Sequence, residues 1–290
     1  MTTPDGKRRQ EGRYAARLYL ACILIGILGG VAALVLKTSV HSLEAFLRGF
    51  SASRDLNLLL LFLPTAGLLL TTLFVRRVAR ADLSHGVTKV LASLSRDEGR
   101  ISPGMIWQPL VACTITVGFG GSMGMEAPIM HSGSAIGSNV ARLLRLDSKD
   151  RILLVGAGCA AAVAAIFKAP VAGALFAIEI LMIDLTAKAI IPLFASSVTG
   201  ALLARIVTGS SIEYSFAVSE AFDYRNIPFY ILLGLLTGAT AAYLRAATRH
   251  AAALSRRLDR PYLKALAGGL CLAALILFFP TLFGEGYSGL

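Results

Sequence analysis

The sequence predicts an all-α membrane protein, and three observations lead to this fold class. Hydrophobic residues make up 56% of the 290 residues, whereas only 16% are charged. The mean hydropathy is +0.69, far above that of a soluble domain of this length. Apolar stretches recur along the chain at lengths near those that cross or re-enter a bilayer of about 30 Å. We therefore expect a multi-pass protein of a cell or inner membrane.

The apolar stretches are uneven in length, and several are interrupted by glycine or proline. Broken segments of this kind are typical of transporters and channels, in which helix ends and free backbone groups face an ion. The sequence thus predicts a bundle of tilted, broken and re-entrant helices. The stretches lie at residues 16–36, 57–75, 105–119, 152–183, 189–208, 228–244 and 263–283.

Basic residues account for a net charge of +11, and they concentrate in short segments between the apolar stretches. This distribution indicates membrane orientation and argues against nucleic-acid binding. A basic cluster at residues 7–17 places the N-terminus in the cytoplasm. By the same rule, the loops at 37–55 and 209–227 are expected outside, and the segments at 76–80 and 245–264 are expected inside.

An internal repeat is predicted by residues 24–33 and 232–241, whose small and apolar residues align position by position. The charge pattern makes the two segments start on opposite sides of the membrane, as in an inverted repeat. Each copy later reaches a short polar turn, at residues 84–87 in the first copy and at 284–287 in the second.

The repeat divides the chain into four segments. Residues 1–15 form a cytoplasmic leader, 16–208 the first transmembrane repeat, 209–225 an external linker and 226–290 the beginning of the second repeat. The second copy stops before any counterpart of the glycine-rich segment of the first. The pattern therefore predicts a second repeat that is truncated in this chain, and a non-conducting half-protein that needs a second polypeptide is one open interpretation.

Glu126 is the strongest candidate for a functional residue, because it is the one carboxylate in the glycine-rich segment 118–137. A charged group at membrane depth costs at least about 2.5 kcal/mol, and irregular backbone persists there only beside protein or a water-filled cavity. Glu126 is therefore a candidate pore or gate residue. The alternative is an acidic residue that only complements a helix dipole.

Three motifs occur in a fixed order along the chain. Residues 84–88 read Ser-His-Gly-Val-Thr, residues 124–128 read Gly-Met-Glu-Ala-Pro, and residues 167–179 read Phe-Lys-Ala-Pro-Val-Ala-Gly-Ala-Leu-Phe-Ala-Ile-Glu. In this order they resemble signatures of the CLC family of chloride channels and chloride/proton antiporters. The resemblance implies an inverted-repeat helical bundle that transports chloride. It also implies a homodimer with one pore per subunit, since residues 170–208 resemble part of the family's dimer interface.

The resemblance assigns roles to individual residues. Glu126 takes the position of the family's external gate. His85 replaces the usual serine of the first turn, where it is either an anion ligand that binds better when protonated or the cap of a helix. The remaining anion-binding positions implied by the motifs are Ser84, Gly86, Val87, Gly124, Met125 and Ala127.

Three further positions bear on the mode of transport and on the charges along the pathway. Ile180 stands where many antiporters of the family carry an internal glutamate that relays protons, so it favours channel-like conduction, with proton-coupled antiport as the alternative. Lys168 either pairs with a carboxylate such as Glu179 or Asp184 or attracts anions into an inner vestibule. Glu179 is expected to have a structural, hydrogen-bonded role.

Other classes of function find no support in the sequence. No nucleophile with its base, phosphate loop or metal-ligand spacing is present, so neither an enzyme nor a metal site is expected. The four cysteines lie singly in separate apolar stretches and are expected to be packing residues. A cation pathway built on Glu126 is disfavoured by the surplus of arginine and lysine. The expected partners are chloride or another small anion and the lipid bilayer, with no cofactor.

Overall fold

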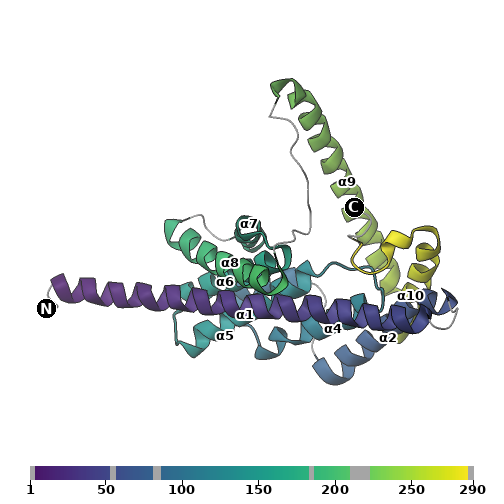
Figure 1. Ribbon diagram of the computed structural model, residues 1–290, viewed down its shortest axis with the longest axis horizontal. Helices are drawn as coiled ribbons and strands as arrows, with labels where there is room; N and C mark the ends of the chain where they lie inside the picture. Colours follow the sequence, from purple (N-terminus) through teal and green to yellow (C-terminus); the bar gives the residue numbers. More distant parts are fainter. Residues whose placement is uncertain (1–3, 53–56, 81–85, 183–185, 210–222, 287–290) are drawn as a thin grey trace.

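The computed structural model describes residues 4–52, 57–80, 86–182, 186–209 and 223–286, and within these ranges its regular secondary structure is helical (Figure 1). Four short helices, η1 to η4, accompany ten α-helices. The α-helices are α1 (Pro4–Ala52), α2 (Asn57–Phe74), α3 (Gly86–Arg96), α4 (Gln108–Gly118), α5 (Glu126–Leu143), α6 (Ser148–Phe167), α7 (Pro170–Leu181), α8 (Ala187–Thr208), α9 (Ile227–Arg256) and α10 (Pro261–Phe278). The short helices are η1 (Val75–Ala79), η2 (Pro103–Ile106), η3 (Tyr224–Asn226) and η4 (Pro280–Leu282).

Six helical segments among the described residues are long and apolar enough to cross a membrane. They belong to α1, α2 with η1, α6, α8, α9 with η3, and α10. The prediction of an all-α, multi-pass membrane protein is therefore confirmed.

Helix α1 runs along the whole molecule (Figure 1). It begins at Pro4 and ends at Ala52, so the described part of the leader and residues 37–52 belong to one helix. The expected loop at 37–55 is wrong for residues 37–52. Charge predicts the side of the membrane, but it does not end a helix, and Glu44 pairs with Arg48 one turn later at 2.6 Å.

Helix α6 is the centre of the bundle, with a continuous buried stretch from residue 154 to residue 166. It packs against α1, α5, α7 and α8. A Cβ added at Gly158 would lie 2.0 Å from the Gly133 carbonyl oxygen, and one added at Gly137 would lie 1.9 Å from the Leu154 carbonyl oxygen. The backbones of α5 and α6 are therefore in direct contact, as small residues permit in membrane bundles.

The apolar stretch 152–183 contains two helices rather than one. Helix α6 ends at Phe167, and the next residue, Lys168, adopts a left-handed conformation with φ of 53°. The Ala169 N–H then donates to the Ala164 carbonyl oxygen at 3.1 Å. Pro170 starts α7, where its missing N–H costs no helical hydrogen bond. Because of this break, α6 and α7 are separate helices whose axes point in different directions.

Helix α9 projects away from this bundle, whereas α10 lies beside α2 (Figure 1). The most apolar window of α9 is 0% buried. Helix α10 packs against α2, where Gly269 lies so close to Thr65 that an added Cβ would be 2.6 Å from the Thr65 Cα. The start of the second repeat therefore reaches the first through α10 and the turn that follows it.

Candidate functional site

Two contacts on α1 define the two ends of the bundle. Near the N-terminus, the Tyr14 hydroxyl donates a hydrogen bond to the Asp150 carboxylate at the start of α6. Far along the same helix, Leu43 packs where Gly118 has no side chain. Tyr14 and Leu43 are roughly 40 Å apart along α1, because an α-helix rises 1.5 Å per residue. The segment that leads to Glu126 therefore lies at the end of the bundle remote from the N-terminus.

A glycine turn ends α4 just before Glu126. The Gly120 N–H donates to the Val117 carbonyl at 2.7 Å, and the Gly121 N–H donates to the Thr116 carbonyl at 2.8 Å. Gly120 has φ of 86°, as a left-handed helix cap requires. A Cβ at Gly121 would lie 2.6 Å from the Thr116 carbonyl oxygen. The geometry of the cap itself thus explains Gly120 and Gly121.

Glu126 is the first residue of α5, as the sequence predicts for a residue at a helix N-terminus. Its side chain turns back along the chain, since a Cβ added at Gly124 would lie 2.0 Å from Glu126 Oε2. Glu126 is half-buried, Met125 is buried and Ala127 is exposed. The carboxylate therefore occupies the space beside the first turn of α5, where amide groups concentrate positive potential.

The second predicted turn is only partly within the described residues. Ser84 and His85 lie outside them, whereas Gly86 begins α3 as predicted. Val87 packs against the buried core, and α3 contacts α5. Lys89 on α3 is close enough to interact electrostatically with His131 on α5, and His131 is buried as expected for a packed residue. The starts of α3 and α5 therefore belong to one region.

Lys168 lies at the end of α6 opposite Asp150, so it shares the Glu126 end of the bundle with Lys37, with which it interacts electrostatically. Its side chain is 5% exposed, and its Nζ donates to the Gly209 carbonyl oxygen at 3.1 Å. The inner-vestibule role of Lys168 depends on the orientation of the chain in the membrane and stays a prediction. This buried hydrogen bond is compatible with a structural charge, and the pairing of Lys168 with a carboxylate such as Glu179 or Asp184 also stays a prediction.

Glu179 and Ile180 are neighbours near the end of α7. Glu179 is exposed, whereas Ile180 is half-buried and packs against the core. The expected structural role of Glu179 remains a prediction, and Ile180 offers no titratable group on the core side of α7. Asp184, the other proposed partner of Lys168, lies outside the described residues.

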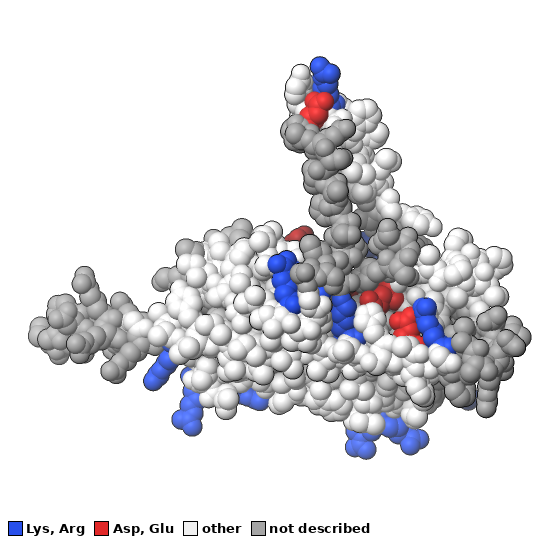
Figure 2. Space-filling model, viewed as in Figure 1, with Lys and Arg blue, Asp and Glu red and all other residues white. Residues whose placement is uncertain are grey.

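A charged cluster beside Glu126 was not anticipated from the sequence. Glu285, in the turn after η4, interacts electrostatically with Lys37, His41 and Glu44 of α1 and with Glu126. Figure 2 shows acidic and basic side chains side by side on the viewed face, near the end of α1 remote from the N-terminus. The available signal was the repeat, which aligns the turn at 284–287 with the turn at 84–87.

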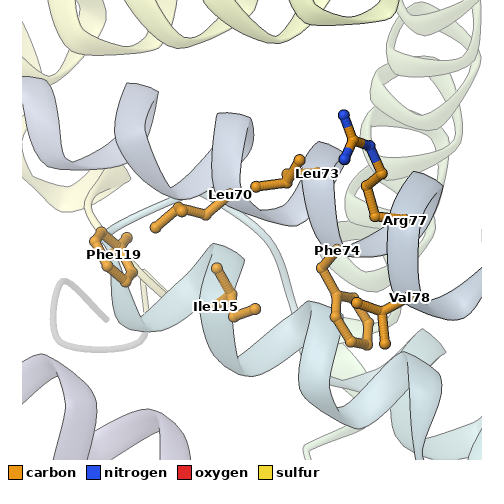
Figure 3. Close-up of a pocket in the computed structure, with 7 residues that line it drawn as sticks. All are labelled: Leu70, Leu73, Phe74, Arg77, Val78, Ile115 and Phe119. Atoms are coloured by element: carbon orange, nitrogen blue, oxygen red, sulfur yellow. The ribbon is translucent and has the colours of Figure 1, made fainter.

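A separate apolar pocket of about 460 Å³ lies between α2 with η1 and α4 (Figure 3). Arg77 is its one charged lining residue. Glu126 is not among its lining residues, so we do not assign the pocket to the candidate site. Its lining residues are Leu70, Leu73, Phe74, Arg77, Val78, Ile115 and Phe119.

The described residues contain no group of three or more His, Cys, Asp or Glu side chains that could hold a metal ion. Cys22, Cys113 and Cys159 are buried free thiols, in agreement with packing roles. Cys271 is exposed on α10, so the expectation of packing is wrong for this residue.

Comparison with known proteins identifies related sequences along nearly the whole chain. A family model described as "Voltage gated chloride channel" matches residues 66–290. A ClcB-like protein of Ralstonia nicotianae is 28% identical over 91% of this chain and 64% of its own length. The chloride channel protein CLC-e of Arabidopsis thaliana is 29% identical over 92% of this chain and 40% of its own length. The chain therefore spans less than two thirds of these relatives.

Solved structures share the fold. A CLC-type fluoride/proton antiporter matches with a TM-score of 0.79 and 22% identity over 99% of this chain and 68% of its own. A slow cyanobacterial Cl⁻/H⁺ antiporter also matches with a TM-score of 0.79 and 22% identity, over 93% of this chain and 66% of its own. These similarities support the predicted CLC-type architecture.

Proposed function

The chain belongs to the voltage-gated chloride channel family, and we propose that it forms an anion pathway gated by Glu126. The observation that carries the proposal is the position of the Glu126 carboxylate, which turns back over Gly124 beside the first turn of α5. With the N-terminus in the cytoplasm, this position is on the external side. Chloride is the proposed ion, because the family description and the names of the relatives specify it.

Helix ends supply the physical basis for anion binding. The start of an α-helix carries roughly half an elementary positive charge and amide donors without helical acceptors. An anion is stabilised there without a full counter-charge that would trap it. The starts of α3 and α5, at Gly86 and Glu126, are the two proposed helix ends, and α3 contacts α5. The anion-binding positions proposed from the motifs are Ser84, His85, Gly86, Val87, Gly124, Met125 and Ala127.

The gate works by competition in this proposal. The ionised Glu126 carboxylate occupies the helix end that an anion would occupy, so it excludes the anion. Protonation removes the negative charge, and the neutral side chain no longer competes. External acid or a high anion concentration therefore opens the path.

Replacement of Glu126 tests the gate. Glu126→Gln keeps the size of the side chain and removes its charge, so we expect higher chloride flux that no longer depends on external pH. The measurement is chloride efflux from proteoliposomes across a range of external pH. Glu98→Gln, an exposed carboxylate near Arg100 and Arg151, is the matched control and should retain the normal response. A normal pH response in Glu126→Gln would reject the gate.

Channel-like conduction is the favoured mode, because Ile180 provides no carboxylate at the position of the internal proton relay. The alternative is coupled antiport, which both structural neighbours perform according to their titles. Simultaneous records of voltage and internal pH distinguish the two. Steady uphill proton movement driven by a chloride gradient would establish exchange and reject the channel mode.

A homodimer is proposed through α7 and α8. These helices expose large apolar side chains, among them Val171, Leu175, Val198 and Leu202, on the segment that resembles the family's dimer interface. Single cysteines at Leu175 and Leu202 should form cross-links between two copies in vesicles. A cysteine at exposed Leu233 on α9 should form none, and equal cross-linking from that position would contradict the assignment.

A further inference from the structure

The turn that carries Glu285 is attached directly to the glycine cap that leads into α5. The Gly284 N–H donates to the Gly120 carbonyl at 3.3 Å. The Phe283 ring lies against Gly120, where an added Cβ would be 2.3 Å from Phe283 Cε2. Glu285 therefore has a defined position beside the segment that holds Glu126, although 159 positions separate them in the numbering.

Charged and titratable groups of α1, α4 and α5 interact electrostatically with Glu285. Lys37, His41 and Glu44 approach from α1, and Glu126 approaches from α5. Arg48 pairs with Glu44 at 2.6 Å and lies 5.4 Å from the centre of the Phe283 ring. From further elements, the Cys113 thiol on α4 interacts with both Glu285 and Glu126, and Lys168 at the end of α6 interacts with Lys37.

The Glu285 carboxylate is in an environment that destabilises its ionised form. Its Oε1 atom is buried and has no hydrogen-bond partner among the described residues. Burial raises the pKa of Glu285 above its ordinary value, the carboxylates of Glu44 and Glu126 raise it further, and His41 and Lys37 oppose the rise. The residue follows the last candidate span, which ends at Phe278. The side chain thus holds a proton to higher pH than an exposed glutamate does.

We propose that Glu285 is a second proton-binding site at the outer entrance of the anion path and that its charge controls proton binding by Glu126. The inference rests on the proposed gate. A proton from external water converts the carboxylate to a neutral acid, which removes one negative charge from the entrance. An ionised Glu285 also repels the negative charge of Glu126, and the neutral acid does not.

The direction of the coupling is testable with Glu285→Gln. Removal of a negative neighbour makes the ionised form of Glu126 easier to maintain, so stronger acid is needed to open the path. We expect the midpoint of acid-activated chloride efflux to move to lower pH by roughly 0.5 to 1 unit, the usual size of such shifts in proteins. In a Glu126→Gln background, in which efflux is expected not to depend on external pH, the same substitution should introduce no pH dependence. Glu98→Gln serves again as the control.

The outcomes separate the two proposals. A pH-independent Glu126→Gln variant together with an unshifted Glu285→Gln midpoint would retain the gate and reject the coupling. A Glu126→Gln variant that keeps its pH response, with that response lost in Glu285→Gln, would reject the gate and leave Glu285 as the titrating group. A midpoint shifted to higher pH would reject the proposed sign of the interaction.

A second measurement does not depend on transport. Infrared difference spectra of the reconstituted protein, recorded during external acidification, report the appearance of protonated carboxyl groups. Glu285→Gln should remove one carboxyl band and move a second, assigned by Glu126→Gln, to lower pH. Identical titrations of the original protein and Glu285→Gln would overturn the proposal. Size-exclusion profiles establish that each variant remains folded.

Discussion

Helices α1 and α9 begin two copies of the same repeat, yet only α1 is embedded in the bundle. The most apolar window of α1 is 44% buried, and that of α9 is 0% buried. Gly26 of α1 lies against Thr199, and Gly30 lies against Gly200 and Leu203 of α8. The aligned residues of α9, Gly234 and Gly238, have nothing within 4 Å of an added Cβ.

The difference shows that a pattern of small residues predicts a surface for close helix packing but not the helix that occupies it. In α1 this surface meets α6 and α8, which also have small residues at the contact. In α9 the same pattern faces outward throughout the described structure. Burial of the repeated segment is therefore decided by its neighbours, and substitutions can measure that effect directly.

The largest contrast is expected from Gly158→Ala and Gly238→Ala. The new methyl group at Gly158 would lie 2.0 Å from the Gly133 carbonyl oxygen, so α5 and α6 must separate. We expect a loss of about 3 kcal/mol, at the upper end for an overpacked core. Gly238→Ala adds a better helix former in open space and should be neutral or slightly stabilising. Thermal unfolding in detergent, followed by size exclusion, measures both, and equal losses would contradict the comparison.

An intermediate contrast is expected between the aligned residues Gly26 and Gly234. A Cβ at Gly26 would lie 2.6 Å from Thr199 Cβ and 2.8 Å from the Ser196 carbonyl oxygen. Because part of this contact is a side chain that can move, Gly26→Ala should cost about 2 kcal/mol. Gly234→Ala should leave the melting temperature unchanged within one or two degrees, on the order expected for a surface substitution. A comparable loss in both variants would mean that α9 packs as α1 does.

The smallest contrast concerns an aspartate near the start of the first helix of each copy, which is Asp150 beside Tyr14 of α1 and Asp223 just before α9. Asp150 is 8% exposed and accepts a hydrogen bond from Tyr14, which ties α1 to α6. Asp223 is exposed and accepts a local hydrogen bond from the Arg225 N–H at 2.9 Å. We expect Asp150→Asn to cost about 1 kcal/mol, because Tyr14 is partly open to solvent, and Asp223→Asn to cost less. Non-additivity of Tyr14→Phe with Asp150→Asn in the same unfolding assay would confirm the contact, whereas full additivity would exclude it.

Sequence reasoning was most successful where the local signal was strong. The helix starts at Gly86 and Glu126 and the membrane class were predicted from short patterns. The charge pattern does not predict the extension of α1 through residues 37–52, because a change of charge indicates a side of the membrane and does not end a helix. The external linker at 209–225 lies almost wholly outside the described residues, so that boundary remains a prediction.

The sequence by itself determined the class of the protein, the order of its helical segments and the candidacy of Glu126, since hydropathy, charge bias and glycine caps act through neighbouring residues. Tertiary structure alone decided which groups surround that carboxylate. Lys37 and Glu285 meet near Glu126 only because α1 runs the length of the bundle and Phe283 rests on Gly120. Such contacts depend on the close packing of distant helices, and no local pattern in the chain specifies them.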